Sequence, residues 1–118
     1  MKSRIMSEQD LSFMLYDWLD VEQLTKRSRY QDHSRETFDG VLALAEQLAE
    51  RDFAPHNRAG DLQEPWFDGK SVHIIPQVAQ ALKALADSGL TSATLDAELG
   101  GGQLPHVVGR AAATWLQA

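Results

Sequence analysis

The sequence predicts an all-α domain, a bundle of four main helices with a long irregular loop. Four segments repeat apolar residues at intervals of three and four, the spacing that gathers them on one face of an α-helix. Prolines and glycines interrupt this pattern between residues 54 and 75, which predicts the loop. The chain has 118 residues, enough for a single domain with its own core and too few for two full domains.

Composition excludes several classes of protein. Eleven basic and 17 acidic side chains give a net charge of -6, opposite to that of a general nucleic-acid binder. There is no cysteine, which excludes disulfide scaffolds, thiol catalysis and cysteine-bound metal. No apolar run approaches the roughly 20 residues of a membrane span, and the N-terminus does not lead into a signal-peptide core. We therefore expect a cytoplasmic protein with no nucleic-acid partner and no membrane span.

The first predicted helix covers residues 8–19, with Ser7 as N-cap and acidic residues in its first turn. Residues 25–35, which follow, are polar and rich in cations. The favoured interpretation is a solvated loop, and the alternative is an anion-binding patch whose affinity would fall steeply with salt. The apolar face of the helix consists of Leu11, Met14, Leu15, Trp18 and Leu19, and the cations are Lys26, Arg27, Arg29 and Arg35.

The second predicted helix covers residues 34–52, with Ser34 as its cap and Pro55 as its stop, because a residue before proline leaves helical geometry. Gly40 inside it costs roughly 1 kcal/mol relative to alanine, and a close approach of another helix would explain it. Its apolar face consists of Phe38, Val41, Leu42, Ala45, Leu48 and Ala49.

The irregular stretch contains a candidate hairpin. Asp68-Gly69 is a turn signal between two apolar segments, which predicts a small β-hairpin. The flanking side chains are too apolar for a free linker, so we expect the loop to pack on helices of this chain or of a partner. These side chains are Trp66, Phe67, Ile74 and Ile75.

The third predicted helix starts at Pro76 and ends before Gly89, and the fourth begins near Pro105. Between them a single turn over residues 96–99 precedes a glycine run. The fourth helix keeps its apolar face to the end without a capping residue, so we expect the natural chain to continue. The face of the third helix consists of Val78, Ala79, Leu82, Leu85 and Ala86. That of the fourth consists of Val107, Val108, Ala111, Ala112, Trp115 and Leu116.

Catalytic and metal-binding patterns are not found. No histidine pair has the spacing of a metal site, and no GxSxG elbow of a serine hydrolase occurs. Acidic pairs fall on the polar faces of the predicted helices, where burial would not tune them for catalysis. The glycine run lacks a P-loop lysine and is interpreted as a flexible joint. The sequence therefore predicts no catalytic residue and no metal. The histidines are His33, His56, His73 and His106.

Three ordered stretches resemble the N-terminal region of acyl-CoA dehydrogenases, in the subgroup with an extra N-terminal helical extension. They are DLSFMLYDWLDVE at 10–22, APHNRAGD at 54–61 and DAELGGGQLP at 96–105. The corresponding family patterns are D-x-x-F-x-L-x-x-x-L-D-V-E, A-P-x-N-R-x-G-D and D-P-E-Y-G-G-Q-G-L-P. This sequence departs from the third, with Ala97 for the proline, Leu99 for the aromatic residue, and Gly102-Gln103 in exchanged order.

The resemblance implies an N-terminal domain over residues 1–118, with an extension helix and basic loop at 1–33 and a bundle at 34–118. Family members oxidise acyl-CoA thioesters between C2 and C3 with FAD. Their catalytic glutamate and most flavin contacts lie in a middle and a C-terminal domain. We therefore expect neither a catalytic residue nor bound FAD in this chain alone. The implied partners are those two domains, acyl-CoA in the full-length protein, and further copies in a homo-oligomer.

The implied function is to form one wall of the substrate and flavin cleft, in a fragment inactive by itself. The alternative is a non-catalytic helical protein-interaction module derived from that domain. By resemblance, the substrate-channel loop consists of Leu99, Gly100, Gly101, Gly102, Gln103, Leu104 and Pro105. The residues expected at interdomain contacts are Trp66, Phe67 and Trp115.

Overall fold

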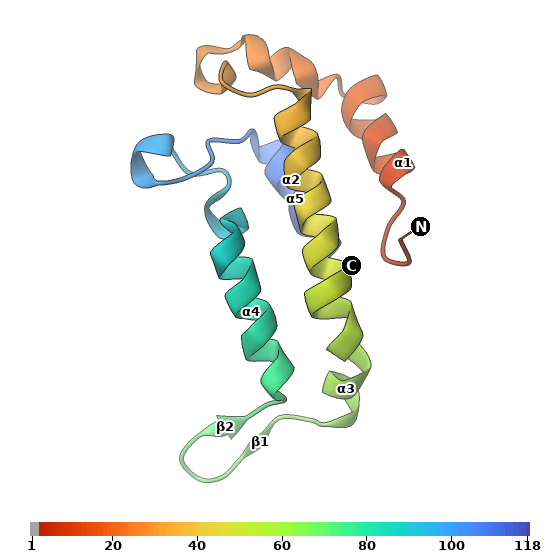
Figure 1. Cartoon of the computed structure of the whole chain (residues 1–118), viewed down its shortest axis with the longest axis vertical. Coiled ribbons are helices and arrows are strands. Elements are labelled where there is room, and N and C mark those ends of the chain that lie inside the picture. The colour runs from red at the N-terminus through yellow and green to blue at the C-terminus, as the bar shows by residue number, and fades with distance from the viewer. Residues whose placement is uncertain (1–2) are drawn as a thin grey trace.

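The computed structural model describes residues 3–118 as a mostly helical, flattened molecule of 54 × 35 × 17 Å (Figure 1). The helical class predicted from the sequence is confirmed. Five α-helices and a two-stranded hairpin make up its regular elements. They are α1 (Glu8–Ser12), α2 (Arg35–Leu48), α3 (Asn57–Leu62), β1 (Trp66–Phe67), β2 (Val72–His73), α4 (Pro76–Ser88) and α5 (His106–Gln117). None of the helices in this described part is long and apolar enough to cross a membrane.

The core lies between α2 and α5, which pack along each other. Phe38 from α2 and Val108 and Trp115 from α5 belong to this core, and all three side chains are fully buried. The buried residues of α5 match the predicted face, which is therefore confirmed. They are Val108, Ala111, Ala112 and Trp115.

The N-terminal helix begins as predicted, because the Ser7 hydroxyl accepts the Asp10 backbone N–H at 3.2 Å. Its second half, Phe13–Trp18, winds as a wider π-helical turn. Leu11 and Leu15 are buried, whereas Met14, Trp18 and Leu19 of the predicted face are exposed. The wider turn changes the angle between successive side chains, so the 3.6-residue pattern does not hold past residue 15.

The second helical path does not end at Pro55, which corrects the predicted stop. After α2 a wide turn, Ala49–Phe53, ends with the Ala54 N–H bonded to the Ala49 carbonyl. A 3₁₀ turn at Ala54–His56 and the short helix α3 follow. Pro55 lies in the first turn of this new segment, where its missing N–H has no helical partner to lose.

The glycine that marks a close approach is Gly109 and not Gly40. A Cβ added to Gly109 would lie 2.5 Å from Thr94 Cγ2, while one added to Gly40 would meet no described atom within 4 Å. The expected close packing at Gly40 is therefore wrong. The helix that contains it turns this position to solvent.

Helix α4 has the predicted ends but only part of the predicted face. It starts at Pro76 and stops at Gly89. Ala81 is buried, and Leu82 of the predicted face is 55% exposed. Apolar residues occur on more than one side of this alanine-rich helix. The side of α4 that packs against the turn after α2 is the side that becomes buried.

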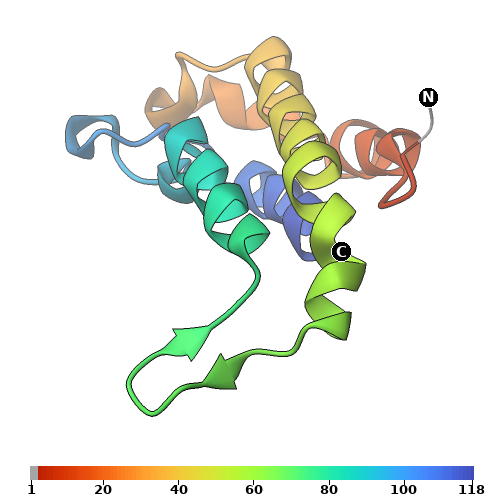
Figure 2. The same cartoon turned by 60° about the horizontal axis from the view of Figure 1, so that its bottom comes forward.

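The predicted hairpin is confirmed. Trp66 pairs with His73 and Phe67 with Val72 in an antiparallel ladder. Both views show the hairpin extending away from the helices (Figures 1 and 2). Ile75 at its base is buried, whereas the strand residues are exposed. Packing of the loop on this chain's own helices is thus limited to its base.

Candidate functional site

The glycine loop, defined here as residues 95–105, is tightly folded. Its turn Ala97–Leu99 ends at Gly100, whose φ of +84° lies in the left-handed region that favours glycine. A Cβ on Gly101 would lie 2.2 Å from the Leu95 carbonyl oxygen. Only glycine fits at that distance, so the interpretation of this run as a flexible joint is wrong.

The backbone amides of residues 99–104 are already bonded. Gly101 donates to Asp96 O at 3.0 Å, and Gly102 donates to Ser92 O at 3.1 Å. The amides of Gln103 and Leu104 likewise bond to residues 95 and 93, each at 2.9 Å. A phosphate cradle needs backbone N–H groups that point at the ligand. The loop therefore does not fit the pyrophosphate of a flavin or a nucleotide by itself.

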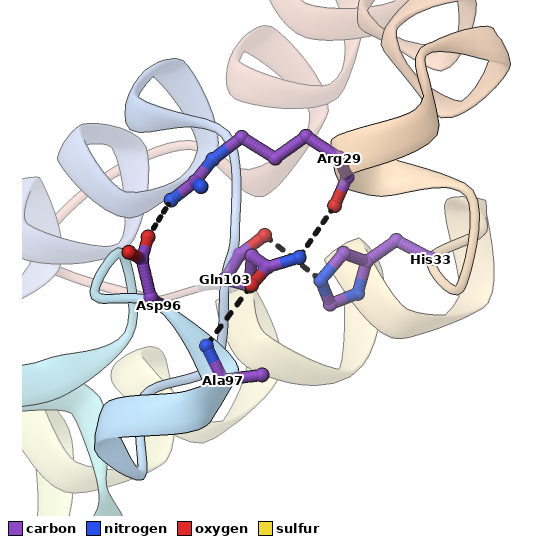
Figure 3. A network of polar contacts seen from close by, with 5 residues as sticks. All are labelled: Arg29, His33, Asp96, Ala97 and Gln103. Carbon is purple, nitrogen blue, oxygen red and sulfur yellow. Dashed lines mark hydrogen bonds and ion pairs between the residues drawn. The ribbon is translucent and has the colours of Figure 1, made fainter.

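A polar network joins the glycine loop to the cation-rich segment before α2 (Figure 3). The Gln103 side-chain amide donates to the Arg29 carbonyl at 2.8 Å and accepts the Ala97 N–H at 3.0 Å. The Arg29 guanidinium pairs with the Asp96 carboxylate at 2.5 Å, a contact that raises the pKa of Arg29 above its usual value. We call this set of contacts the Gln103 clamp.

His33 supports the clamp from the side of α2. Its Nε2 lies 3.1 Å from the Gln103 carbonyl oxygen, and because a carbonyl only accepts, Nε2 carries the proton of this bond. The buried Nδ1 has no hydrogen-bond partner among the described residues. The ring lies beside Phe38, with centroids 6.0 Å apart. His33 thus connects the core to the loop.

A second cation of the same segment is held by α2 and its neighbours. Arg35 pairs with Glu22 at 3.4 Å and Asp39 at 3.8 Å. Its guanidinium lies 3.9 Å from the centre of the Tyr16 ring, an arrangement that favours a cation–π contact. Tyr16 donates to Asp39 at 2.5 Å, and burial followed by this bond raises the pKa of Tyr16 far above its usual value.

These contacts weaken the anion-patch interpretation. Arg29 and Arg35 already have carboxylate partners. Lys26 and Arg27 are exposed and form no ion pair within residues 3–118. Two exposed cations without partners would attract an anion only weakly, because water and salt screen charges at the surface.

The structure divides the predicted substrate-channel loop into a surface part and an anchor. Leu99 is 75% exposed and Leu95 is half-exposed, whereas Leu104 and Pro105 are buried. The loop thus presents an apolar tip on a base packed into the core. Sequence reasoning missed the Gln103 clamp, because Arg29 lies 67 residues from Asp96 and 74 residues from Gln103 in the chain.

The three residues expected at interdomain contacts lie in different environments. Trp66 and Phe67 are exposed on the hairpin, while Trp115 is 1% exposed inside the core of this chain. The Trp115 indole N–H has no partner among the described residues. Trp115 therefore belongs to the internal packing that holds α5 on α2.

An acidic groove of about 260 Å³ lies between α1 and α2. Glu8, Asp39 and Glu46 line it together with Leu11 and Leu42. Partial burial, followed by the charges of Glu8 and Glu50, raises the pKa of Glu46. No group of three or more acidic or histidine side chains in the described residues is arranged to hold a metal ion.

Comparison with known proteins finds a distant sequence similarity to an acyl-CoA dehydrogenase. The chain is 28% identical over 120 residues to the broad-specificity linear acyl-CoA dehydrogenase FadE5 of Mycobacterium tuberculosis (strain ATCC 25618 / H37Rv). The match covers 92% of this chain and 20% of that protein, so the chain spans about a fifth of its relative's length. No protein-family model matches the chain, and no solved structure matches it. The similarity suggests a relation to acyl-CoA dehydrogenases.

Proposed function

We propose that this chain is the N-terminal helical domain of an acyl-CoA dehydrogenase-like flavoprotein. In this proposal it forms one wall of the substrate and flavin cleft and is inactive alone. The observation that carries the proposal is the similarity to FadE5, which extends over 92% of this chain and only 20% of the relative. A middle and a C-terminal domain would be its partners, and acyl-CoA its substrate in the complete enzyme.

The glycine loop supports this role by its shape. Its base is fixed by Leu104 and the Gln103 clamp, while Leu99 in its turn and Leu95 stay exposed. Exposed apolar side chains on a rigid base suit contact with an acyl chain or with the apolar surface of another domain. In this proposal flavin and the catalytic base come from the other domains, as the resemblance implies.

A chimera tests this proposal. Residues 10–118 of this chain replace the matching fifth of FadE5, and the purified chimera is assayed for flavin absorbance and for acyl-CoA oxidation with an artificial electron acceptor. We expect retained flavin and measurable oxidation. A chimera that folds and binds flavin but shows no oxidation contradicts the proposal. So does stoichiometric FAD retained by this chain alone through gel filtration.

A matched pair of variants examines the loop within the same chimera. Leu99→Ser removes the most exposed apolar side chain of the loop tip, and Leu82→Ser removes an exposed leucine of α4. We expect Leu99→Ser to raise KM for long acyl-CoA thioesters with unchanged flavin content, because it removes apolar contact area. Leu82→Ser should leave KM unchanged. Equal KM values in both variants would contradict a substrate-facing loop.

The alternative function is a non-catalytic interaction module that binds a protein partner without flavin. The exposed aromatic hairpin favours it, because isolated monomers rarely leave such side chains uncovered. Reading the coding sequence beyond codon 118 distinguishes the enzyme domain from the interaction module. An open frame that encodes a flavin domain supports the enzyme, and a stop codon supports the module.

A further inference from the structure

The groove between α1 and α2 is lined by one row of side chains from each helix. Asp39, Ala43 and Glu46 follow one another on α2 at intervals of four and three residues, which places them on one side of the helix. Glu8 and Ser12 line it from α1 at an interval of four. The open volume is about 260 Å³. Pockets for drug-sized ligands start at about 300 Å³, so this groove suits a single side chain.

The two ends of the groove differ in their balance of charge. At one end the chain supplies its own cation, because the Arg35 guanidinium lies 3.8 Å from the Asp39 carboxylate, which also accepts the Tyr16 hydroxyl. Two helical turns further along α2, roughly 10 Å away, Glu46 forms no ion pair within residues 3–118, and neither does Glu8. This second end therefore carries negative charge that the described residues do not balance.

The two carboxylates at this end act on each other. Partial burial raises the pKa of Glu46, and the negative charge of Glu8 raises it further. A cation placed between them would remove this repulsion and favour the ionised form of both. The chemistry of this end thus fits a positively charged ligand.

A buried hydrogen-bond donor borders the same groove. Trp115, from α5, lines it together with Leu11 and Leu42, and the tryptophan side chain is 1% exposed. Its indole N–H has no partner among the described residues. A buried donor without an acceptor is unfavourable, so a ligand that brings an oxygen to this N–H gains affinity. The lining therefore combines two carboxylates, an apolar wall and one vacant donor.

We propose that this groove binds a lysine side chain of a partner protein, with the ammonium group between Glu8 and Glu46. The aliphatic stem of the lysine lies along Leu11 and Leu42, and a main-chain carbonyl of the partner accepts the Trp115 N–H. An ammonium group is a compact charge with three donors, so it can serve both carboxylates. The net charge of -6 attracts a basic partner from a distance. The site does not depend on the proposed function.

Titration of the whole chain with N-acetyl-lysine methylamide, followed by NMR of the indole N–H groups, tests the site. The chain has three tryptophans, and Trp115→Phe identifies the signal of Trp115. We expect saturable binding with a dissociation constant on the order of 1 mM, a shift of the Trp115 signal and none of the Trp66 signal. The norleucine analogue lacks the ammonium and should bind at least about tenfold more weakly. No saturable shift, or equal binding of the two analogues, overturns the proposal.

Three variants locate the cation. Glu46→Gln removes one carboxylate at nearly constant shape and should raise the dissociation constant about tenfold. Glu64→Gln makes the same change of net charge at an exposed position before β1, and it should change the constant less than about twofold. Ala43→Leu keeps every charge but fills the groove, and it should abolish saturable binding. Circular dichroism checks that each variant is folded. Equal effects of Glu46→Gln and Glu64→Gln would show attraction to net charge alone and overturn the site.

A simpler amine tests the bond assigned to Trp115. n-Butylammonium has the stem and charge of lysine but no carbonyl, so it should bind in the groove and shift the Trp115 signal less than the lysine probe does. Its binding should weaken in Glu46→Gln as that of the lysine probe does. A Trp115 shift of equal size with both ligands would contradict a bond from this N–H to the partner's main chain.

Discussion

The side-chain amide of Gln103 donates a hydrogen bond at 2.8 Å to the backbone carbonyl of Arg29, 74 residues earlier in the chain. The same amide accepts the Ala97 N–H, so one side chain braces the glycine loop and links it to the segment before α2. The φ of Gln103 is +51°, which an ordinary residue adopts at a cost. Its hydrogen bonds offset that cost.

Two substitutions at residue 103 distinguish the stability contributed by the Gln103 side-chain hydrogen bonds from the cost of its left-handed backbone. Gln103→Ala loses both side-chain bonds and keeps the left-handed backbone, so it should lower the free energy of unfolding by about 1–2 kcal/mol. Gln103→Gly loses the same bonds but relieves the strain, and it should be less destabilising. Urea denaturation measures both, and hydrogen exchange over residues 95–103 should accelerate in each. A glycine variant less stable than the alanine variant would contradict this account.

Two glycine-to-alanine changes should have opposite signs. Gly101→Ala places a methyl group 2.2 Å from the Leu95 carbonyl oxygen, so the loop must distort, and we expect a loss of at least about 2 kcal/mol. Gly40→Ala lies on the open side of α2, where no described atom is within 4 Å. It should stabilise the chain by about 0.5–1 kcal/mol through helix propensity. Thermal unfolding compares them, and a destabilising Gly40→Ala would refute the open environment.

Two substitutions of Trp115 distinguish the stability contributed by apolar packing from the cost of burying its indole N–H. The side chain is 1% exposed, and its N–H has no described partner. Trp115→Ala should therefore cost about 3–5 kcal/mol by leaving a cavity. Trp115→Phe keeps much of the ring volume and removes an unpaired polar group, so its cost should be clearly smaller. Equal losses in chemical denaturation would show that the N–H is bonded in solution.

Asp68 makes the hairpin turn sensitive to strong acid. The hydrogen bond from His73 at 2.6 Å, followed by the Ser71 and Lys70 amides, lowers the pKa of Asp68 to about 2. A lowered carboxyl pKa contributes stability that is present above the ordinary value of 3.8 and is lost as pH falls through about 2.

Carbon-13 NMR of the Asp68 carboxyl measures this titration directly. We expect a midpoint well below 3.8 in the natural chain. His73→Ala removes the largest contribution and should move the midpoint up toward 3.8, while the neighbouring Lys70→Ala keeps the backbone amide and should change it little. An unshifted midpoint in the natural chain would contradict the turn geometry.

Local sequence signals predicted the ends of elements well. Ser7 caps α1, Pro76 and Gly89 bound α4, and Asp68-Gly69 turns the hairpin. Each of these signals acts through bonds or dihedral angles within about four residues. Pro55 is the exception, because it lies in a 3₁₀ turn, Ala54–His56, that continues the helical path into α3.

The sequence by itself determined the helical class, the positions of most helices and the absence of cysteine chemistry, because these depend on composition and on contacts between near neighbours. Only the tertiary structure decided which side of α4 is buried, that Gly109 and not Gly40 is closely packed, and that Gln103 reaches Arg29. The physical reason is distance along the chain. A pattern of three and four residues specifies a face, but the partner of that face, or of a side chain 74 residues away, is selected by how the helices assemble.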